Sequence, residues 1–306
     1  MLQVTVDIFS GRPNPSWIVY GDEAEAMLKE IAANRDVVAE IGSDLKVLGY
    51  RGVHVALISD HTGGEFDLPG RFVLANGTSA NEAKGLELAV RLVEGMTRYT
   101  TRQDPFEEYS PVAQVQKLIL EDMRASVQRF QKLKKEPGVL QEVDLVKAAK
   151  HPKIKAHCSI ELGWFNPGFW NNDPYVTANN NCYNYGRNWR TNTYAQPGLA
   201  SGNWPYPMAC DRVTSAALSD GAHVRYDCFP ASEAPRWLMA LVVRPGVDYH
   251  WYRKHRNGFW GHKMASTPAR NTDDSGVVIL DPQTCDRGPY TDFCGYLYAC
   301  RSMHIT

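Results

Sequence analysis

Three short strand-like runs, separated by two turn signals, lie between residues 235 and 263 in the segment PRWLMALVVRPGVDYHWYRKHRNGFWGHK. The runs RWLMALVV and DYHWYRKH are rich in the β-branched and aromatic residues that strands favour. Pro-Gly separates these two runs, and Arg-Asn-Gly separates the second from the run FWGHK. Because short turns of this kind join antiparallel neighbours, the segment predicts a β-meander.

The first part of the chain predicts a small α+β domain over residues 1–105. LQVTVDIF alternates apolar and polar residues as a strand does, and the turn formers in SGRPNP end it. The pattern predicts a helix in GDEAEAMLKEIAANRDVVAEIG and strands in VHVALISD and GRFVLAN. A further helix is predicted over residues 81–96, capped by Ser79 or by Asn81.

An amphipathic helix is predicted over residues 111–134, where apolar side chains recur on one stripe. We interpret residues 106–149 as a helical connector whose helix packs on one or both domains, with a partner-binding helix as the alternative. Beyond about residue 150 the composition shifts to Trp, Tyr, Asn, Pro and Gly, which indicates a second domain over residues 150–306. The fold class predicted for the whole chain is therefore α+β. All seven cysteines lie in this second domain: Cys158, Cys182, Cys210, Cys228, Cys285, Cys294 and Cys300.

Charge and hydropathy exclude several classes of protein. The formal net charge of -1 provides no electrostatic drive toward nucleic acid. No apolar run approaches the length of about 18 residues that a membrane span needs, and no cleavable signal is recognised. We therefore expect a cytoplasmic protein or one exported without a cleaved signal. Neither a cofactor nor a structural metal is expected, because no Cys-x-x-Cys pair occurs; the oligomeric state is not indicated.

Cys182 stands out among the cysteines because it follows a run of asparagines in NNNCYNYGRN. Asn is a preferred N-cap, so a helix is predicted to begin here with Cys182 in its first turn. A helix N-terminus stabilises a thiolate, and the backbone N–H of Cys182 would face a developing oxyanion. The position suits a nucleophile, whereas Cys285, Cys294 and Cys300, in an aromatic strand pattern, are predicted to form disulfides or to pack in the core.

Two histidines of the meander are predicted to meet. His250 lies near the start of the second strand and His262 near the end of the third, 12 positions later (262 − 250), so antiparallel pairing brings them together. One imidazole would act as a base and the other would orient it. His255 differs from His250 by an odd number of residues and faces the opposite side of the strand. In an alternative, His262 is the base and Asn271 or Asp273 orients it; a zinc site on the histidines and a cysteine is a further alternative.

A cysteine at a helix start, followed by a strand that begins with a histidine and a second histidine on the next strand, resembles the NlpC-type branch of papain-like cysteine peptidases. The resemblance covers roughly residues 180–265. It implies a papain-like domain in which Cys182 is the nucleophile, His250 the base and His262 the orienting residue. It further implies hydrolysis of an amide bond through a thioester, with a peptide or a peptidoglycan stem peptide as substrate.

Two other classes of function remain open. A transferase or deamidase would use the same three residues. A non-catalytic, disulfide-containing binding or toxin-like module would instead use the Tyr/Trp/Asn loops as a binding surface. The loop SGRPNPSW either binds an acidic group or forms a rigid turn that packs Trp17 on the sheet. The aromatic residues that could line a peptide or sugar cleft are Trp164, Phe169, Trp170, Trp189 and Trp204.

Overall fold

The computed structural model describes residues 1–43, 45–58, 66–99, 112–135, 160–224 and 230–306. The chain divides into two compact units, the first made of Met1–Ile8 and Asn14–Pro137 and the second of Phe9–Pro13 and Gly138–Thr306. Both units contain helices and strands, which confirms the mixed α and β character expected from the sequence. Within the described residues, no helix is both long and apolar enough to cross a bilayer.

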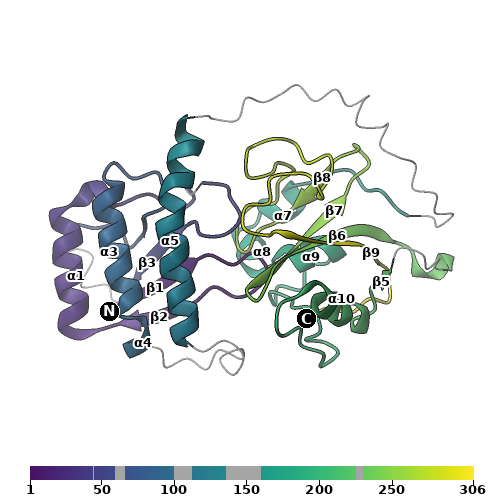
Figure 1. Cartoon of the computed structure of the whole chain (residues 1–306), viewed down its shortest axis with the longest axis horizontal. Helices are drawn as coiled ribbons and strands as arrows, with labels where there is room; N and C mark the ends of the chain where they lie inside the picture. Colours follow the sequence, from purple (N-terminus) through teal and green to yellow (C-terminus); the bar gives the residue numbers. More distant parts are fainter. Residues whose placement is uncertain (44, 59–65, 100–111, 136–159, 225–229) are drawn as a thin grey trace. The chain divides into compact units, whose positions relative to one another are not determined.

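The first unit contains a four-stranded antiparallel sheet with the order β2-β1-β3-β4, of which Figure 1 labels β1, β2 and β3. Its core comes from the alternation that the sequence displays, since Val4 of β1 pairs with Trp17 and with Val55, and all three side chains are buried. The elements of this unit are β1 (Leu2–Asp7), β2 (Ser16–Val19), α1 (Gly21–Ala33), η1 (Arg35–Val37), β3 (Gly52–Leu57), β4 (Arg71–Leu74), α3 (Glu82–Glu94), α4 (Met96–Tyr99) and α5 (Val112–Lys135).

Two helix ends in this unit follow from local capping. α1 is shorter than its sequence pattern predicts, because Asn34 leaves helical geometry and its side chain donates to the Glu30 carbonyl oxygen. α3 begins after Asn81, whose side chain accepts a hydrogen bond from the Lys84 N–H. Of the two caps that the sequence allows, Asn81 is the one used.

Helix α5 packs on α3 in the first unit, and residues 106–111 and 136–149 of the predicted connector lie outside the described residues. Its apolar stripe is buried at Ile119, Met123 and Phe130, and Gln116 donates to the Val93 carbonyl oxygen of α3. An amphipathic helix needs a partner for its apolar face, and α3 provides one. The first unit therefore extends beyond the predicted boundary at residue 105.

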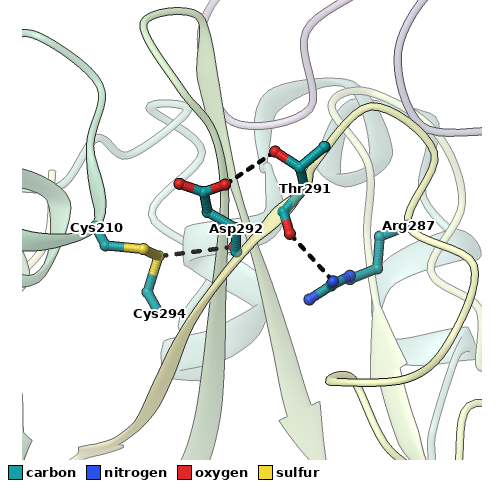
Figure 2. Close-up of a disulfide and its surroundings, with 5 residues drawn as sticks. All are labelled: Cys210, Arg287, Thr291, Asp292 and Cys294. Carbon is teal, nitrogen blue, oxygen red and sulfur yellow. Dashed lines mark hydrogen bonds between the residues drawn. A yellow bond between two sulfur atoms is a disulfide. The ribbon is translucent and has the colours of Figure 1, made fainter.

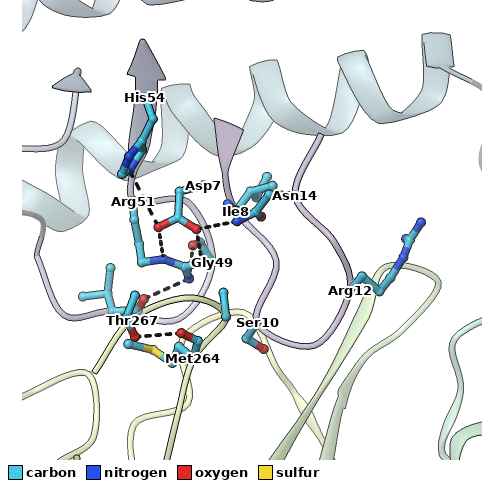
Figure 3. Close-up of polar contacts among 12 residues, drawn as sticks. Asp7, Ile8, Ser10, Arg12, Asn14, Gly49, Arg51, His54, Met264 and Thr267 are labelled. Atoms are coloured by element: carbon cyan, nitrogen blue, oxygen red, sulfur yellow. Dashed lines mark hydrogen bonds and ion pairs between the residues drawn. The ribbon is translucent and has the colours of Figure 1, made fainter. Parts of the chain in front are cut away.

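A buried ion pair joins β1 to the residue before β3 (Figure 3). The Arg51 guanidinium donates from Nε and Nη2 to the two Asp7 carboxylate oxygens, at 2.8 and 2.5 Å, and both residues are buried. Asn14 adds a hydrogen bond of 2.7 Å to Asp7 Oδ1, and Arg51 Nη1 donates to the Gly49 carbonyl oxygen at 2.9 Å. Burial alone would raise the pKa of Asp7, but Arg51 outweighs it and holds that pKa below its usual value.

The second unit contains a five-stranded antiparallel sheet with the order β5-β9-β6-β7-β8 (Figure 1). The predicted meander is present as β6, β7 and β8, and β9 pairs with the outer side of β6. The elements are α7 (Gly168–Asn171), α8 (Pro174–Asn179), α9 (Cys182–Arg187), α10 (Cys210–Ser219), β5 (His223–Val224), η2 (Ala231–Glu233), β6 (Trp237–Arg244), β7 (Asp248–Lys254), β8 (Trp260–His262) and β9 (Asp292–Ala299).

Helices α9 and α10 cover one face of this sheet, and a disulfide fixes α10 to it. Cys210 in the first turn of α10 is bonded to Cys294 of β9, 84 positions later (Figure 2). The prediction of disulfide or core packing holds for Cys294, which is bonded, and for Cys300, which is a buried free thiol, but not for Cys285, which is only partly buried. Cys285 is also free, and Cys158 and Cys228 lie outside the described residues.

Candidate functional site

Cys182 begins helix α9, as the asparagine run predicts. The Asn181 side chain accepts hydrogen bonds from the N–H groups of Tyr183 and Asn184, and the Asn184 side chain accepts one from the Asn181 N–H. This reciprocal capping box fixes the start of a helix of six residues. Asn181 also donates to the Gly11 carbonyl oxygen, so the cap is tied to the Phe9–Pro13 segment of the same unit.

The thiol of Cys182 is sealed in the core between α9 and the sheet. It is free but fully buried, and its cluster includes Tyr249 and Trp251 of β7 and Leu241 of β6. Burial, and secondarily the negative charge of Asp248, raises the pKa of Cys182 well above its usual value. The cysteine is therefore a protonated core residue, which is the opposite of the thiolate that its helix position suggests.

The two histidines meet as their spacing predicts. β7 and β8 pair with Tyr252 opposite His262, and His250 Nε2 lies 2.8 Å from His262 Nδ1. Both rings are fully buried, and burial together with Arg270 lowers the pKa of His262 well below its usual value. An N–N contact this short leaves no space for a zinc ion between the two rings.

The other predicted partners of His262 do not contact its ring. Its Nε2 lies 2.9 Å from the Thr272 carbonyl oxygen, and Arg270 Nε approaches the same nitrogen at 3.0 Å. The Asp273 carboxylate accepts hydrogen bonds from the N–H groups of its own loop, at residues 275, 277 and 286. Asn271 uses its main-chain carbonyl oxygen to accept from the Ile279 N–H.

Cys182 and the histidine pair belong to opposite faces of the sheet. Successive side chains of a strand point to opposite faces, and Trp251 is in the core cluster of Cys182. His250 instead packs against Tyr252 and Tyr290, with ring centroids 4.8 and 6.0 Å away. The structure thus brings His250 to His262 and does not bring Cys182 to either. The catalytic roles of Cys182, His250 and His262 stay predictions. The placement of Cys182 and His250 on opposite faces of the sheet disfavours them.

A buried polar network continues from His250 to the Phe9–Pro13 segment. His250 Nδ1 lies 3.1 Å from Ser10 Oγ, which also contacts Tyr290 Oη at 2.8 Å. Asp248 accepts hydrogen bonds from the N–H groups of Ser10, Gly11 and Arg12 and from Tyr290 Oη. The motif SGRPNP was distinctive in the sequence. No sequence pattern indicated that Asp248 is its partner. The loop thus binds a carboxylate of the chain itself through its main-chain N–H groups, and Trp17 is also buried, as the alternative of a rigid turn predicts.

Lys263, next to His262, is a second ionisable group that sequence reasoning missed. Its Nζ donates to the carbonyl oxygens of Thr177, Asn180 and Ala265, at 2.5, 2.5 and 2.8 Å. Burial lowers its pKa to about 7, while the three carbonyl oxygens favour the protonated form. Lys263 therefore fixes the segment that precedes α9 to the end of β8.

An open cleft lies elsewhere on the second unit, with a volume of about 210 Å³. Trp164 and Phe169 are exposed there, with 64% and 38% of their surface accessible, whereas Trp170 and Arg253 are buried. Three aromatic residues that the sequence singled out thus share one site. The full lining is Gly163, Trp164, Asn166, Phe169, Trp170, Asn188, Trp237, Arg253 and His255.

Arginines stack on the aromatic rings of this cleft. The Arg253 guanidinium lies 5.6 Å from the Trp237 ring, Arg256 lies 5.2 Å from Trp164, and Arg190 lies 3.4 Å from Phe169. Such cation–π contacts hold a guanidinium in place while its edge stays free to donate. The other aromatic candidates lie outside the lining: Trp189 stacks against Arg187, and Trp204 packs against the core.

His255, which lines the cleft, is neutral and has a polar partner at each ring nitrogen. Tyr185 Oη lies 2.7 Å from His255 Nε2, and His255 Nδ1 lies 3.3 Å from the Gly163 carbonyl oxygen. Burial, with the nearby Arg253, lowers the pKa of His255 to about 3, so its ring is uncharged at neutral pH. Arg253 is therefore the one cation that the described part of the chain contributes to the lining.

Comparison with known proteins finds one informative relative. No family model matches the chain, and no solved structure matches it. Insoluble matrix shell protein 1 of Ruditapes philippinarum is 52% identical over 133 residues, which are 44% of this chain and 87% of that protein. The chain belongs to the family of this shell protein. Insoluble matrix shell protein 1 is about half as long as this chain, since the same 133 residues are 87% of that protein and 44% of this chain.

Proposed function

We propose that this chain is a non-catalytic component of an insoluble extracellular matrix and that its second unit is a disulfide-containing binding module. The observation that carries the proposal is the position of Cys182, which is sealed in the core on the face of the sheet opposite His250. Membership of the insoluble matrix shell protein 1 family supports the matrix association.

The rival function is the cysteine hydrolase implied by the papain-like resemblance. That chemistry needs a thiol within hydrogen-bonding reach of an imidazole base, at a position open to substrate. Cys182 meets neither condition, and the raised pKa of its thiol opposes activation. A transferase or deamidase on the same residues has the same requirement, so the geometry favours the binding module over all three.

The disulfide supports an extracellular location. Disulfides persist in oxidising compartments and are rare in the cytosol of most organisms. Cys210 and Cys294 are bonded across 84 positions, and closing such a long loop contributes roughly 2–5 kcal/mol to the free energy of unfolding. We therefore favour export over the cytoplasmic alternative.

Iodoacetamide is expected to leave Cys182 unmodified in the folded chain at neutral pH. Because its thiol is sealed and protonated, modification must wait for unfolding and should be about a thousandfold slower than in the unfolded chain. Peptide mapping by mass spectrometry measures both rates, and labelling in guanidinium chloride is the control. Rapid labelling of native Cys182 that is abolished by His250→Ala would instead favour the hydrolase.

Sequential extraction tests the matrix association directly. Extracellular material of the tissue that secretes this protein is washed with neutral buffer and then with a chelator, and each fraction is quantified by peptide mass spectrometry. We expect most of the protein to remain in the insoluble residue after both washes. Recovery in the soluble intracellular fraction would contradict the proposal.

A further inference from the structure

We propose that the aromatic cleft binds one anionic sugar residue, whose carboxylate or sulfate pairs with Arg253 while Trp164 and Phe169 pack against the sugar ring. This inference rests on the proposed matrix function and gives its binding site a ligand class. Saccharides combine apolar ring faces with hydroxyl groups, and an acidic saccharide adds a negative charge. The cleft offers a complementary group for each of these features.

Arg253 is the charged anchor. Only 6% of its surface is exposed, and Nη1 donates to the Tyr185 carbonyl oxygen at 2.7 Å. Its guanidinium is sandwiched between the rings of Tyr185 and Trp237, at 4.5 and 5.6 Å. Within the described residues, no carboxylate forms an ion pair with it. A buried guanidinium gains most from an anionic partner, with which it forms bidentate hydrogen bonds.

Besides Arg253, the cleft and its edge contain N–H groups that have no hydrogen-bond partner within the described part of the chain. Trp170 is 1% exposed, and its indole Nε1 has no hydrogen-bond partner within the described part of the chain. Buried indole N–H groups usually have one, so a ligand hydroxyl would satisfy this donor. Arg190 Nε, beside Phe169, is likewise buried without a partner, and the side-chain amides of Asn166 and Asn188 line the same cleft.

The electrostatics select an anion. Among the described residues, the lining contains one cation and no carboxylate, and Arg190 and Arg256 stack on the aromatic rings at its edge. The acidic residue Glu161 lies outside the lining and is paired with Arg236 at 2.9 Å. The cation therefore attracts a negatively charged ligand, and no negative charge among the lining residues repels it.

The size of the cleft favours a single sugar over a peptide. Pockets for drug-sized ligands occupy roughly 300–1,000 Å³, whereas this cleft holds about 210 Å³. A single ring-sized group fits this volume, and the open side of the cleft allows the rest of a polymer to continue into solvent. The two exposed aromatic rings suit the flat faces of a pyranose better than the main chain of an acidic peptide.

Binding to polymers of defined charge tests the proposal on the full chain. Titrations followed by tryptophan fluorescence and calorimetry use alginate as a carboxylated saccharide, dextran sulfate as a sulfated one, neutral dextran, and poly-L-glutamate. We expect binding to alginate or dextran sulfate at least tenfold tighter than to dextran and to poly-L-glutamate. The preferred acidic saccharide identifies the anion as carboxylate or sulfate.

Substitutions locate the binding site. Trp164→Ala, at an exposed position where folding is undisturbed, should weaken binding about tenfold. Arg253→Gln should abolish the preference for acidic over neutral saccharide, with circular dichroism to confirm folding. Tyr175→Ala is the matched control, because Tyr175 is 61% exposed and lies outside the lining.

Three outcomes would overturn the inference: tighter binding to poly-L-glutamate, equal weakening by Trp164→Ala and Tyr175→Ala, or no binding to either acidic saccharide. The first would indicate an acidic protein partner, and the second a non-specific surface effect. None of them changes the expected protection of Cys182 or the recovery in the insoluble fraction, so failure here is distinct from failure of the proposed function.

Discussion

Arg51→Met is expected to lower the free energy of unfolding of the first unit by about 3–5 kcal/mol. The substitution leaves the Asp7 carboxylate buried without its guanidinium partner, and it also removes the hydrogen bond from Nη1 to the Gly49 carbonyl oxygen. Amide hydrogen exchange in a denaturant series, read by mass spectrometry, reports the stability of β1 and β3 separately from the second unit.

Arg35→Met is the matched control. Arg35 also pairs with an aspartate, Asp67, but both side chains are largely exposed, so its loss should change stability by no more than about 0.5 kcal/mol. Equal effects of the two substitutions would show that the buried pair contributes no more than a surface one.

The same ion pair predicts how the first unit responds to acid. The pKa of Asp7 is lower in the folded unit than its usual value of 3.8, so the folded state releases its proton more readily than the unfolded state. The contribution of Asp7 is therefore fully present above pH 3.8 and is lost as the pH falls through the folded value. In Arg51→Met burial dominates and raises the pKa of Asp7 in the folded unit, so this acid dependence should reverse its sign.

Asp248→Asn is expected to destabilise the second unit by about 3–5 kcal/mol. The buried carboxylate accepts from three consecutive N–H groups, at 2.7, 3.3 and 3.1 Å, and from Tyr290 Oη at 2.5 Å. An amide replaces one acceptor oxygen by a donor, which leaves buried N–H groups unsatisfied. Hydrogen exchange should show the loss of protection first at Ser10, Gly11 and Arg12.

Asp211→Asn provides the comparison for this effect. The Asp211 side chain is 81% exposed on α10, and its substitution should leave exchange at residues 9–13 unchanged. A wild-type exchange pattern in Asp248→Asn would show that the loop is held by its other contacts.

Local patterns predict most strands and helices of this protein. The alternation in LQVTVDIF, the capping of Asn81 and Asn181 and the turns of the meander each depend on residues close in sequence, and each element is present. The position of β9 beside β6 depends on pairs from Val243–Asp292 (292 − 243 = 49) to Trp237–Ala299 (299 − 237 = 62), and no local pattern encodes that pairing. Both α3 and α5 were predicted as helices. Their contact could not be predicted, because an apolar stripe does not specify which element covers it.

The candidate site shows the same division. The spacing of His250 and His262 is enough to predict their contact, because strand pairing about a turn fixes the register. The face to which Cys182 belongs depends on the side of the sheet that α9 covers, and Tyr249 and Trp251 decide this by filling the core. The aromatic residues of the cleft were recognised by type, whereas Arg253 resembled any charged residue of a strand.

The segment Phe9–Pro13 has a consequence for how the chain is made and cut. It emerges from the ribosome more than 200 residues before its acceptor, Asp248, so the second unit is incomplete until synthesis has passed residue 248. A fragment that begins near residue 138, where the main segment of the second unit starts, would lack Phe9–Pro13. The Asp248 carboxylate would then lose the three N–H groups that donate to it. Recombinant fragments of this half should therefore carry the SGRP sequence, either fused or supplied as a synthetic peptide.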